Sequence, residues 1–215
     1  MSGQRLLIDN DAFIIFTGTD LLSDTLALLG YEPVRALRLH ALPFMLGRQK
    51  SLRKTFPPDV LTKARLACDQ IPALEEREAN PEILGRLIDA SDDINAGEAL
   101  LLAVAIERPE YSLLTGDRRA LIAFGQAAGL TDLREKLAGR IVCTEILLRV
   151  LVSSLGIGEV STRIAPLIPI HRSIGVFFSP GNLADQTQCL EALDSYFTDL
   201  CANVGAALLL DPFSD

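Results

Sequence analysis

The sequence predicts an α/β fold in which a central, mostly parallel sheet is flanked by helices. Short apolar runs of strand length alternate along the chain with longer segments whose apolar residues recur at helical spacing. Strands that alternate with helices form βαβ units, and such units build parallel sheets with helices on both faces. The hydrophobic fraction of 49% is large enough for a full core and argues against a disordered chain.

The first elements are marked by the residues at their ends. Residues 5–9 form a short apolar strand. Residues 20–29 have the spacing of a helix, which Asp20 can cap and Gly30 can stop. Residues 34–42 alternate as a strand does, although two arginines interrupt the alternation.

Prolines and one long apolar run mark three helices in the middle of the chain. Two consecutive prolines open a helix over residues 57–70, and a third proline occupies the first turn of a helix over residues 81–90. The strongest helix is predicted over residues 95–107. It is apolar nearly all round, so we expect it to be buried.

Two further strands each lead into a helix. Residues 111–115 form a strand that is followed by a helix over residues 118–128. Residues 140–143 form the next strand, and Thr144 then caps a helix that ends around residues 155–156.

The sequence changes character near residue 158. Residues 158–181 are rich in Gly, Pro, Ser and Ile, which predicts a linker or an irregular strand. A final helix is expected from apolar residues at helical spacing, namely Leu190, Leu193, Phe197, Leu200 and Val204. We therefore predict a domain over residues 1–157 and a C-terminal extension over residues 158–215, whose amphipathic helix packs on the core or on a partner subunit.

Carboxylates stand beside the apolar runs at three places. Asp9 and Asp11 come at the end of the first strand. Glu98 lies at the start of the most apolar helix, and Asp117 follows a later strand. Ligands of open parallel sheets bind at the edge where the carboxyl ends of the strands meet, so we expect these side chains to converge. Converging carboxylates repel each other unless a cation lies among them, and ligation by oxygen alone suits Mg²⁺ or Mn²⁺.

Each acid also has a structural explanation. Asn95 and Glu98 form a capping-box pattern, and Asp11 and Asp117 can cap the helices that follow them. Asp9 is harder to explain in this way, because a carboxylate at the end of a buried strand is costly unless it is paired or bound to a metal. The shared position of all the acids at one sheet edge favours a functional site.

The order of the motifs LLIDND, then GE at a helix start, then LLTGDRRAL resembles that of the PIN-domain ribonucleases, which include the toxins of bacterial toxin–antitoxin pairs. The positions that match the acidic residues of the family are Asp9, Glu98 and Asp117. The resemblance covers about residues 4–157 and implies a PIN-like three-layer fold. The chain departs from the family in the long stretch between its first and second acids, and in the tail after residue 158.

The resemblance also implies a fourth acid. Glu145 follows the strand at residues 140–143 on the expected sheet edge, with Asp132 and Glu135 as alternatives. Glu145 could equally be a first-turn carboxylate that the helix dipole stabilises.

The activity that the resemblance implies is that of a metal-dependent endoribonuclease. Asp9, Glu98 and Asp117 would be the catalytic residues. They would share the Mg²⁺ or Mn²⁺ ligation with Asp11 and Glu145, in a site for one or two ions that needs no His or Lys as base. RNA would be the substrate and an antitoxin-like protein a partner, and we also expect a homo-oligomer.

A nuclease needs positive charge near its acids, although the net charge of the chain is −8. A local excess of basic residues precedes the middle of the chain: Arg35, Arg38, Arg48, Lys50, Arg53, Lys54, Lys63 and Arg65. Arg118 and Arg119 directly follow Asp117 and could contact a phosphate. An ordinary solvated face explains the basic run equally well, and base stacking is weakly signalled, since only Phe44 and Phe56 lie in that region.

Two other functions fit the same residues. LLIDNDAFI also resembles the hhhhDxD strand of haloacid-dehalogenase-like phosphatases, with Asp9 as nucleophile and Asp11 as general acid. Against it, Phe13 stands where that family has Thr, and no obvious catalytic Lys precedes the Gly-Asp motif. The third hypothesis is a catalytically inactive α/β domain that binds a partner and uses its acids only as helix caps.

Composition indicates the compartment. Four cysteines are widely spread without C-x-x-C pairs, which is typical of buried thiols in a reducing environment. No apolar run reaches membrane-spanning length, and the N-terminal segment lacks the apolar core of a signal peptide. We therefore expect a cytoplasmic protein that does not enter a membrane.

Overall fold

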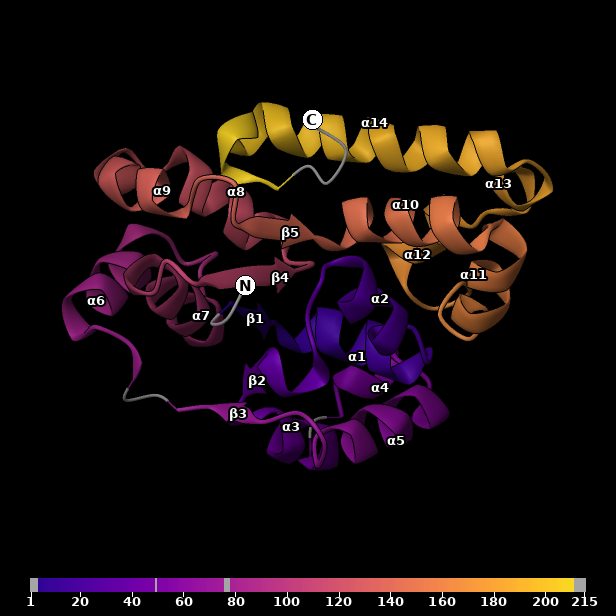
Figure 1. Ribbon diagram of the computed structural model, residues 1–215, viewed down its shortest axis with the longest axis horizontal. Helices are drawn as coiled ribbons and strands as arrows, with labels where there is room; N and C mark the ends of the chain where they lie inside the picture. The colour runs from indigo at the N-terminus through magenta and orange to yellow at the C-terminus, as the bar shows by residue number, and fades with distance from the viewer. Residues whose placement is uncertain (1–3, 49, 76–77, 211–215) are drawn as a thin grey trace.

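The computed structural model describes residues 4–48, 50–75 and 78–210. Its centre is a sheet of five strands, all parallel, in the order β3-β2-β1-β4-β5 (Figure 1). The α/β prediction is therefore confirmed, and the sheet is parallel throughout. The strands are β1 (Arg5–Ile8), β2 (Ala36–Leu39), β3 (Ala73–Leu74), β4 (Tyr111–Thr115) and β5 (Ile141–Cys143).

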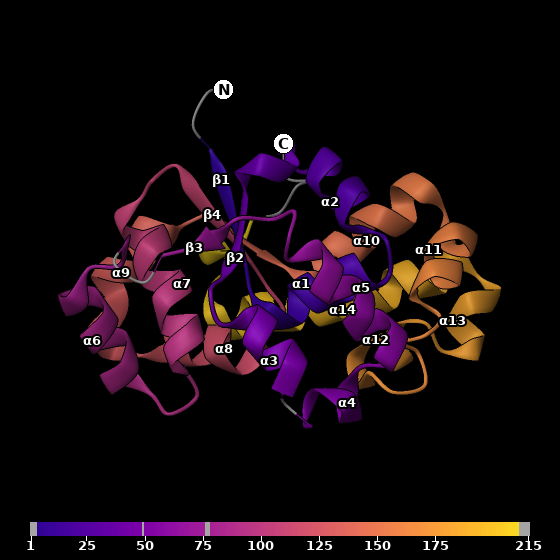
Figure 2. The ribbon, with the colours of Figure 1, turned by 90° about the horizontal axis from the view of Figure 1, so that it is seen from below.

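Helices lie on both sides of this sheet. Figure 2 shows the sheet between these two groups of helices. On one side lie α6 (Pro81–Ala90), α7 (Ala96–Glu107) and α9 (Thr131–Leu137). On the other side lie α1 (Asn10–Gly18), α2 (Leu22–Leu28) and α5 (Pro58–Ala67). The remaining helices of the first 156 residues are α3 (Leu42–Arg48), α4 (Leu52–Thr55), α8 (Arg118–Gln126) and α10 (Thr144–Leu155).

The core forms where the most apolar strand and helix meet. Leu6, Leu7 and Ile8 of β1 are fully buried, as a strand covered on both faces requires. Helix α7 packs against β1 and β4, and its residues 99–106 are all buried. The prediction of a buried helix over residues 95–107 is therefore confirmed.

The strand order creates a crevice between the carboxyl ends of β1 and β4. These two strands pair directly, with Ile8 beside Leu114, yet the helices that follow them diverge. Helix α1 packs on α5, whereas α8 packs on α14 and also contacts α6. The reversal of strand order at this point is where open α/β sheets bind ligands.

Two predicted elements of the first half have other bounds. Residues 34–42 are not one strand, because a 3-10 turn over Pro33–Arg35 precedes β2 and helix α3 already begins at Leu42. Asp20 does not cap the next helix. Its φ of 59° is left-handed, and α2 begins two residues later without a side-chain cap.

The prediction of a linker or irregular strand over residues 158–181 is wrong. The segment forms α11 (Ile157–Ile164), α12 (Arg172–Phe177) and the start of α13 (Pro180–Ala184). The glycine and proline at its ends punctuate these helices, since Gly156 precedes α11 with a φ of 84° and Pro180 occupies a first-turn position of α13. The isoleucines supply the buried faces, as Ile164 and Ile174 show.

The last helix, α14 (Gln186–Val204), packs against α8 and α10 of the same chain. Leu193, Leu200 and Val204 are buried, as the apolar spacing predicts. The chain then passes beside β5, where the N–H of Leu210 donates to the carbonyl of Ile141 at 2.7 Å. Residues after 158 thus contribute to the same hydrophobic core as the sheet, and a domain boundary at residues 157–158 stays a prediction.

Candidate functional site

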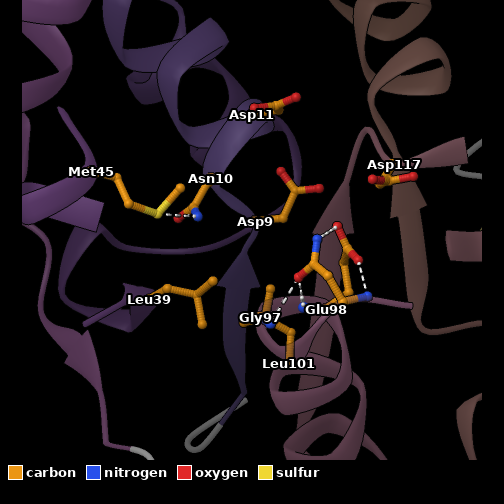
Figure 3. Close-up of a pocket in the computed structure, with 10 residues that line it drawn as sticks. Asp9, Asn10, Asp11, Leu39, Met45, Gly97, Glu98, Leu101 and Asp117 are labelled. Carbon is orange, nitrogen blue, oxygen red and sulfur yellow. Dashed lines mark hydrogen bonds between the residues drawn. The ribbon is translucent and has the colours of Figure 1, made fainter. Parts of the chain in front are cut away.

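A cavity of about 180 Å³ opens at the carboxyl end of β1 (Figure 3). Four of the acids predicted from the sequence line it together: Asp9, Asp11, Glu98 and Asp117. They come from the end of β1, the start of α7 and the end of β4, so they are distant in sequence and adjacent in space. The other lining residues are Asn10, Leu39, Met45, Asn95, Gly97 and Leu101.

Asp9 is held at the centre of this cavity by three hydrogen bonds. It caps α1, since its Oδ1 accepts from the N–H of Ala12 at 2.7 Å. Its Oδ2 accepts from the N–H of Gly116 at 2.9 Å and from the hydroxyl of Thr115. The cap of α1 is therefore Asp9 and not Asp11. These bonds oppose the effect of burial, which nevertheless raises the pKa of Asp9.

Thr115 joins Asp9 to Asp117. Its hydroxyl donates to Asp9 and accepts from the N–H of Asp117 at 3.0 Å. Asp117 caps α8 in turn, because its Oδ1 accepts from the N–H of Ala120 at 3.0 Å. Both aspartates thus stand at the positive ends of helices, which stabilises their charge.

Glu98 takes part in the capping box that the sequence predicts. Its two carboxylate oxygens accept from the backbone N–H and the side-chain amide of Asn95, each at 2.7 Å. Burial raises the pKa of Glu98 to about 7, and Asp117 and Asp9 add to the increase. The hydrogen bond from the backbone N–H of Asn95 lowers this pKa and so opposes them. Glu98 therefore completes the capping box of α7 and also lines the cavity.

Asp11 lies in the first turn of α1, one helix position beyond Asn10 (Figure 3). Its side chain reaches solvent, yet the protein around the carboxylate raises its pKa to about 6 by desolvation, and the charges of Asp9 and Asp117 add to this. The carboxylates of the site therefore repel each other when they are ionised.

Glu145 does not line the cavity. It lies in the first turn of α10 with a side chain only 6% exposed. Burial raises the pKa of Glu145. The positive charge of Arg118 lowers this pKa, and the negative charge of Asp9 raises it. Of the alternatives, Asp132 is engaged at the surface by Arg86 at 2.6 Å, and Glu135 is exposed on α9.

The cavity carries the donors that a hard divalent cation prefers. The charged side chains that line the cavity are all carboxylates, and no Lys or Arg lines it among the described residues. In residues 4–48, 50–75 and 78–210, however, no three His, Cys, Asp or Glu side chains are gathered closely enough to hold one ion. Both carboxylate oxygens of Glu98 accept hydrogen bonds from Asn95, and each keeps a further lone pair that can face the cavity.

The basic residues next to Asp117 lie apart from the cavity. Arg118 pairs with Asp199 of α14, and its guanidinium lies 4.8 Å from the centre of the Tyr196 ring. Arg119 is exposed and lines a different depression.

The earlier basic run divides into two groups. Some of its members serve the fold: Arg38 donates to the carbonyl of Cys68 at 2.9 Å, Lys63 pairs with Asp20 at 2.5 Å, and Arg65 donates to the carbonyl of Pro43 at 3.4 Å. Arg35 is half-buried in the 3-10 turn before β2. The members of the second group are exposed on α3, on α4 and in the turn between them, namely Arg48, Lys50, Arg53 and Lys54. Helix α3, which carries Arg48, also contributes Met45 to the wall of the cavity.

Sequence analysis missed the uncharged wall of the cavity. Asn10 stands between two predicted acids, and this position could have indicated it. Leu39 and Met45 carry no such signal, because an apolar residue in β2 or α3 is read as core. His40, which follows β2 directly, was given no role although it stands on the same sheet edge.

Comparison of the chain with family models, with curated proteins and with solved structures finds no match. Within the part of the chain that the structure describes, none of the helices has both the length and the apolar composition needed to cross a membrane.

Proposed function

We propose that the protein is a metal-dependent endoribonuclease with a PIN-like fold. The observation that carries the proposal is the cavity at the carboxyl ends of β1 and β4. Asp9, Glu98 and Asp117 line this cavity together with Asp11. The order of these acids along the chain is the one that the resemblance to PIN-domain ribonucleases implies. An antitoxin-like partner and a homo-oligomer belong to the same proposal.

The ion, Mg²⁺ or Mn²⁺, would be held by Asp9, Glu98 and Asp117 with help from Asp11. When bound, it would activate a water molecule and stabilise the leaving oxygen of a phosphodiester. The residues around it hold the carboxylates in place. Thr115 bridges the two aspartates, and each aspartate is also fixed by capping the helix that follows it, α1 or α8.

The phosphatase hypothesis is less well supported. It gives no role to Glu98, which lines the same cavity as Asp9.

The hypothesis of an inactive partner-binding domain has one observation in its favour. Asp9 and Asp117 each cap a helix, and Glu98 completes a capping box. Capping alone would account for these residues. Metal binding therefore separates this hypothesis from the nuclease.

The test is cleavage of single-stranded and structured RNA with Mn²⁺, with Mg²⁺ and with EDTA. Asp117→Asn is the sharpest variant, because Asn also caps helices and folding should survive. Asp9→Asn needs a folding control, since its new amide would face the N–H of Gly116. Asp59→Asn is the matched control, as Asp59 is an exposed first-turn acid of α5 outside the cavity.

We expect metal-dependent cleavage by wild type and Asp59→Asn, and its loss in Asp117→Asn. Equal cleavage by all three proteins, after contaminating nuclease is excluded, would refute the proposal.

A further inference from the structure

The cavity has two unlike sides, one acidic and one mostly apolar. Asp117 and Glu98 lie to one side of Asp9, whereas Leu39 and Met45 lie to the other (Figure 3). Aliphatic and thioether groups are poor partners for a hydrated ion, and they suit the flat, weakly polar face of a nucleobase.

One polar atom on this second side lacks a partner. The side-chain amide of Asn10 donates to the sulfur of Met45 at 3.3 Å. Its Oδ1 is buried and accepts no hydrogen bond from any described residue. A buried acceptor of this kind is costly unless a donor reaches it, and RNA offers base N–H groups and 2′-hydroxyls.

An exposed aromatic residue stands beside Met45 on α3. The side chain of Phe44 is 60% exposed, whereas Phe56, the other aromatic of the basic run, is fully buried. The ring of Phe44 lies 6.1 Å from the ring of His40, which follows the cavity residue Leu39 at the end of β2. The two rings are tilted by 46° to each other, so Phe44 offers an exposed aromatic face with His40 at its side. We call this pair of rings the aromatic platform.

Positive charge adjoins this platform. Arg48 lies one helical turn after Phe44 and so shares its face of α3. Lys50, Arg53 and Lys54 follow at once and are exposed, and within residues 4–48, 50–75 and 78–210 none of these four basic residues forms an ion pair. A single exposed Phe needs no explanation, but an aromatic platform with free basic residues on one side and a polar cavity on the other is the arrangement that binds unpaired nucleotides.

We propose that α3 and the end of β2 bind single-stranded RNA, with one unpaired base stacked on the exposed ring of Phe44 and bordered by His40. This inference rests on the proposed nuclease function and names its substrate as an unpaired strand. Arg48, Lys50, Arg53 and Lys54 hold the phosphates on one side of that base. The next nucleotide enters the cavity between Met45 and the carboxylates, beside the unpaired oxygen of Asn10.

The test measures binding rather than cleavage. A fluorescein-labelled single-stranded oligoribonucleotide of about ten nucleotides is titrated with protein in EDTA, so that the strand stays intact, and its anisotropy is followed. Phe44→Ala should weaken binding on the order of tenfold, and Phe44→Trp should restore it. Leu66→Ala is the matched control, because Leu66 is 62% exposed on α5 and lines another depression.

Duplex RNA of the same sequence separates stacking from charge. Its bases are not free to stack, so Phe44→Ala should leave duplex binding unchanged. The pair of changes Arg53→Gln and Lys54→Gln should weaken both kinds of RNA and reduce the dependence of binding on salt.

Each failure has its own signature. Equal affinity of wild type and Phe44→Ala for the single strand overturns the inference, and so does the absence of RNA binding by wild type, which would leave the platform to a protein partner. Metal-dependent cleavage that does not depend on Phe44 overturns the inference and retains the nuclease. Binding that depends on Phe44 without any cleavage retains the inference and removes the nuclease.

Discussion

Arg118 and Asp199 form an ion pair that ties α8 to α14, and the guanidinium of Arg118 also lies over the ring of Tyr196. A second pair of the same kind joins Arg149 of α10 to Asp194 of α14. The last helix thus holds the two helices that follow β4 and β5. Contact between Arg118 and a phosphate, which the sequence suggests, requires the first pair to open.

The substitution Asp199→Asn should lower the free energy of unfolding by less than about 1 kcal/mol. The reason is that the side chain of Asp199 is 63% exposed, so solvent screens the pair, and Tyr196 still holds the guanidinium. Urea unfolding measures the change. The same variant should bind RNA more tightly if Arg118 contacts phosphate, whereas unchanged affinity would leave Arg118 a purely structural role.

The approach of α8 to α14 depends on Gly125. A Cβ there would lie 2.6 Å from the Cα and 2.9 Å from the carbonyl oxygen of Val204, and this backbone cannot move aside without displacing α14. Gly125→Ala should therefore lower the unfolding free energy by about 1–3 kcal/mol, despite the better helix propensity of Ala. Gly129→Ala is the control, because nothing lies within 4 Å of its Cβ position. Equal stability of the two variants would contradict close packing of the last helix.

Thr115 should be a positioning residue for the two aspartates. Thr115→Val keeps the shape of the side chain but leaves the buried Asp9 without one donor and the N–H of Asp117 without its acceptor. The expected loss is about 1–3 kcal/mol of stability, and Thr115→Ser should recover most of it. The readout specific to positioning is the thermal shift on adding Mn²⁺, which should shrink in the Val variant and return in the Ser variant. A Val variant with the full shift would show that the hydroxyl serves folding alone.

His171 should make stability depend on pH. Burial lowers its pKa, and its ring lies 5.7 Å from that of Phe56. The unfolded chain therefore binds a proton at higher pH than the folded chain does. The contribution of His171 is intact above the unfolded pKa of about 6.5 and is lost as pH falls toward the folded value.

The measurement is urea unfolding of wild type and His171→Gln at neutral and mildly acidic pH. The difference in stability between the two proteins should move in favour of the Gln variant as the pH falls. The raised pKa values of Glu98 and Asp11 act in the opposite direction, but they are common to both proteins and cancel in the difference. A difference that does not change with pH would mean that the imidazole is as well solvated in the fold as in the unfolded chain.

The sequence was sufficient for the position of the acids because their place follows from topology. A residue at the carboxyl end of any parallel strand lies on one edge, so Asp9 and Asp117 could be brought together before the strand order was known. The order itself, with β1 between β2 and β4, is a non-local property that no local pattern reports. Met45 and Asn10 face each other only because of that order, which is why the uncharged wall of the cavity was missed.

Several short elements, among them α3, α4, α9, α12 and β3, were not predicted, and tertiary packing decides at least two of them. Strand β3 has two residues, too few for any alternation. Helix α12 has six residues, and its burial is set by Ile174 and Phe177 against the rest of the core rather than by helix propensity. The glycines and prolines of residues 158–181 led to the prediction of a linker, and neither α12 nor β3 has a sequence signal of its own.

Glu98 is the residue at which capping and metal binding give different measurements. Glu98→Gln keeps the shape and one oxygen for the capping box with Asn95, and Gln serves at this position of a helix. If capping is its only role, the substitution should change little, and the stabilisation on adding Mn²⁺ should be the same as in wild type.

If Glu98 is a metal ligand, removing its charge acts in opposite directions on the two forms of the protein. The metal-free protein should be as stable as wild type or more so, because Asp9 and Asp117 lose a repelling neighbour. The metal-induced increase in melting temperature should shrink, since that increase follows the affinity for the ion. Thermal melting of both proteins with and without Mn²⁺ gives all four values. A metal-induced shift of the same size in Glu98→Gln and wild type would remove Glu98 from the metal site and leave the capping box with Asn95 as its whole explanation.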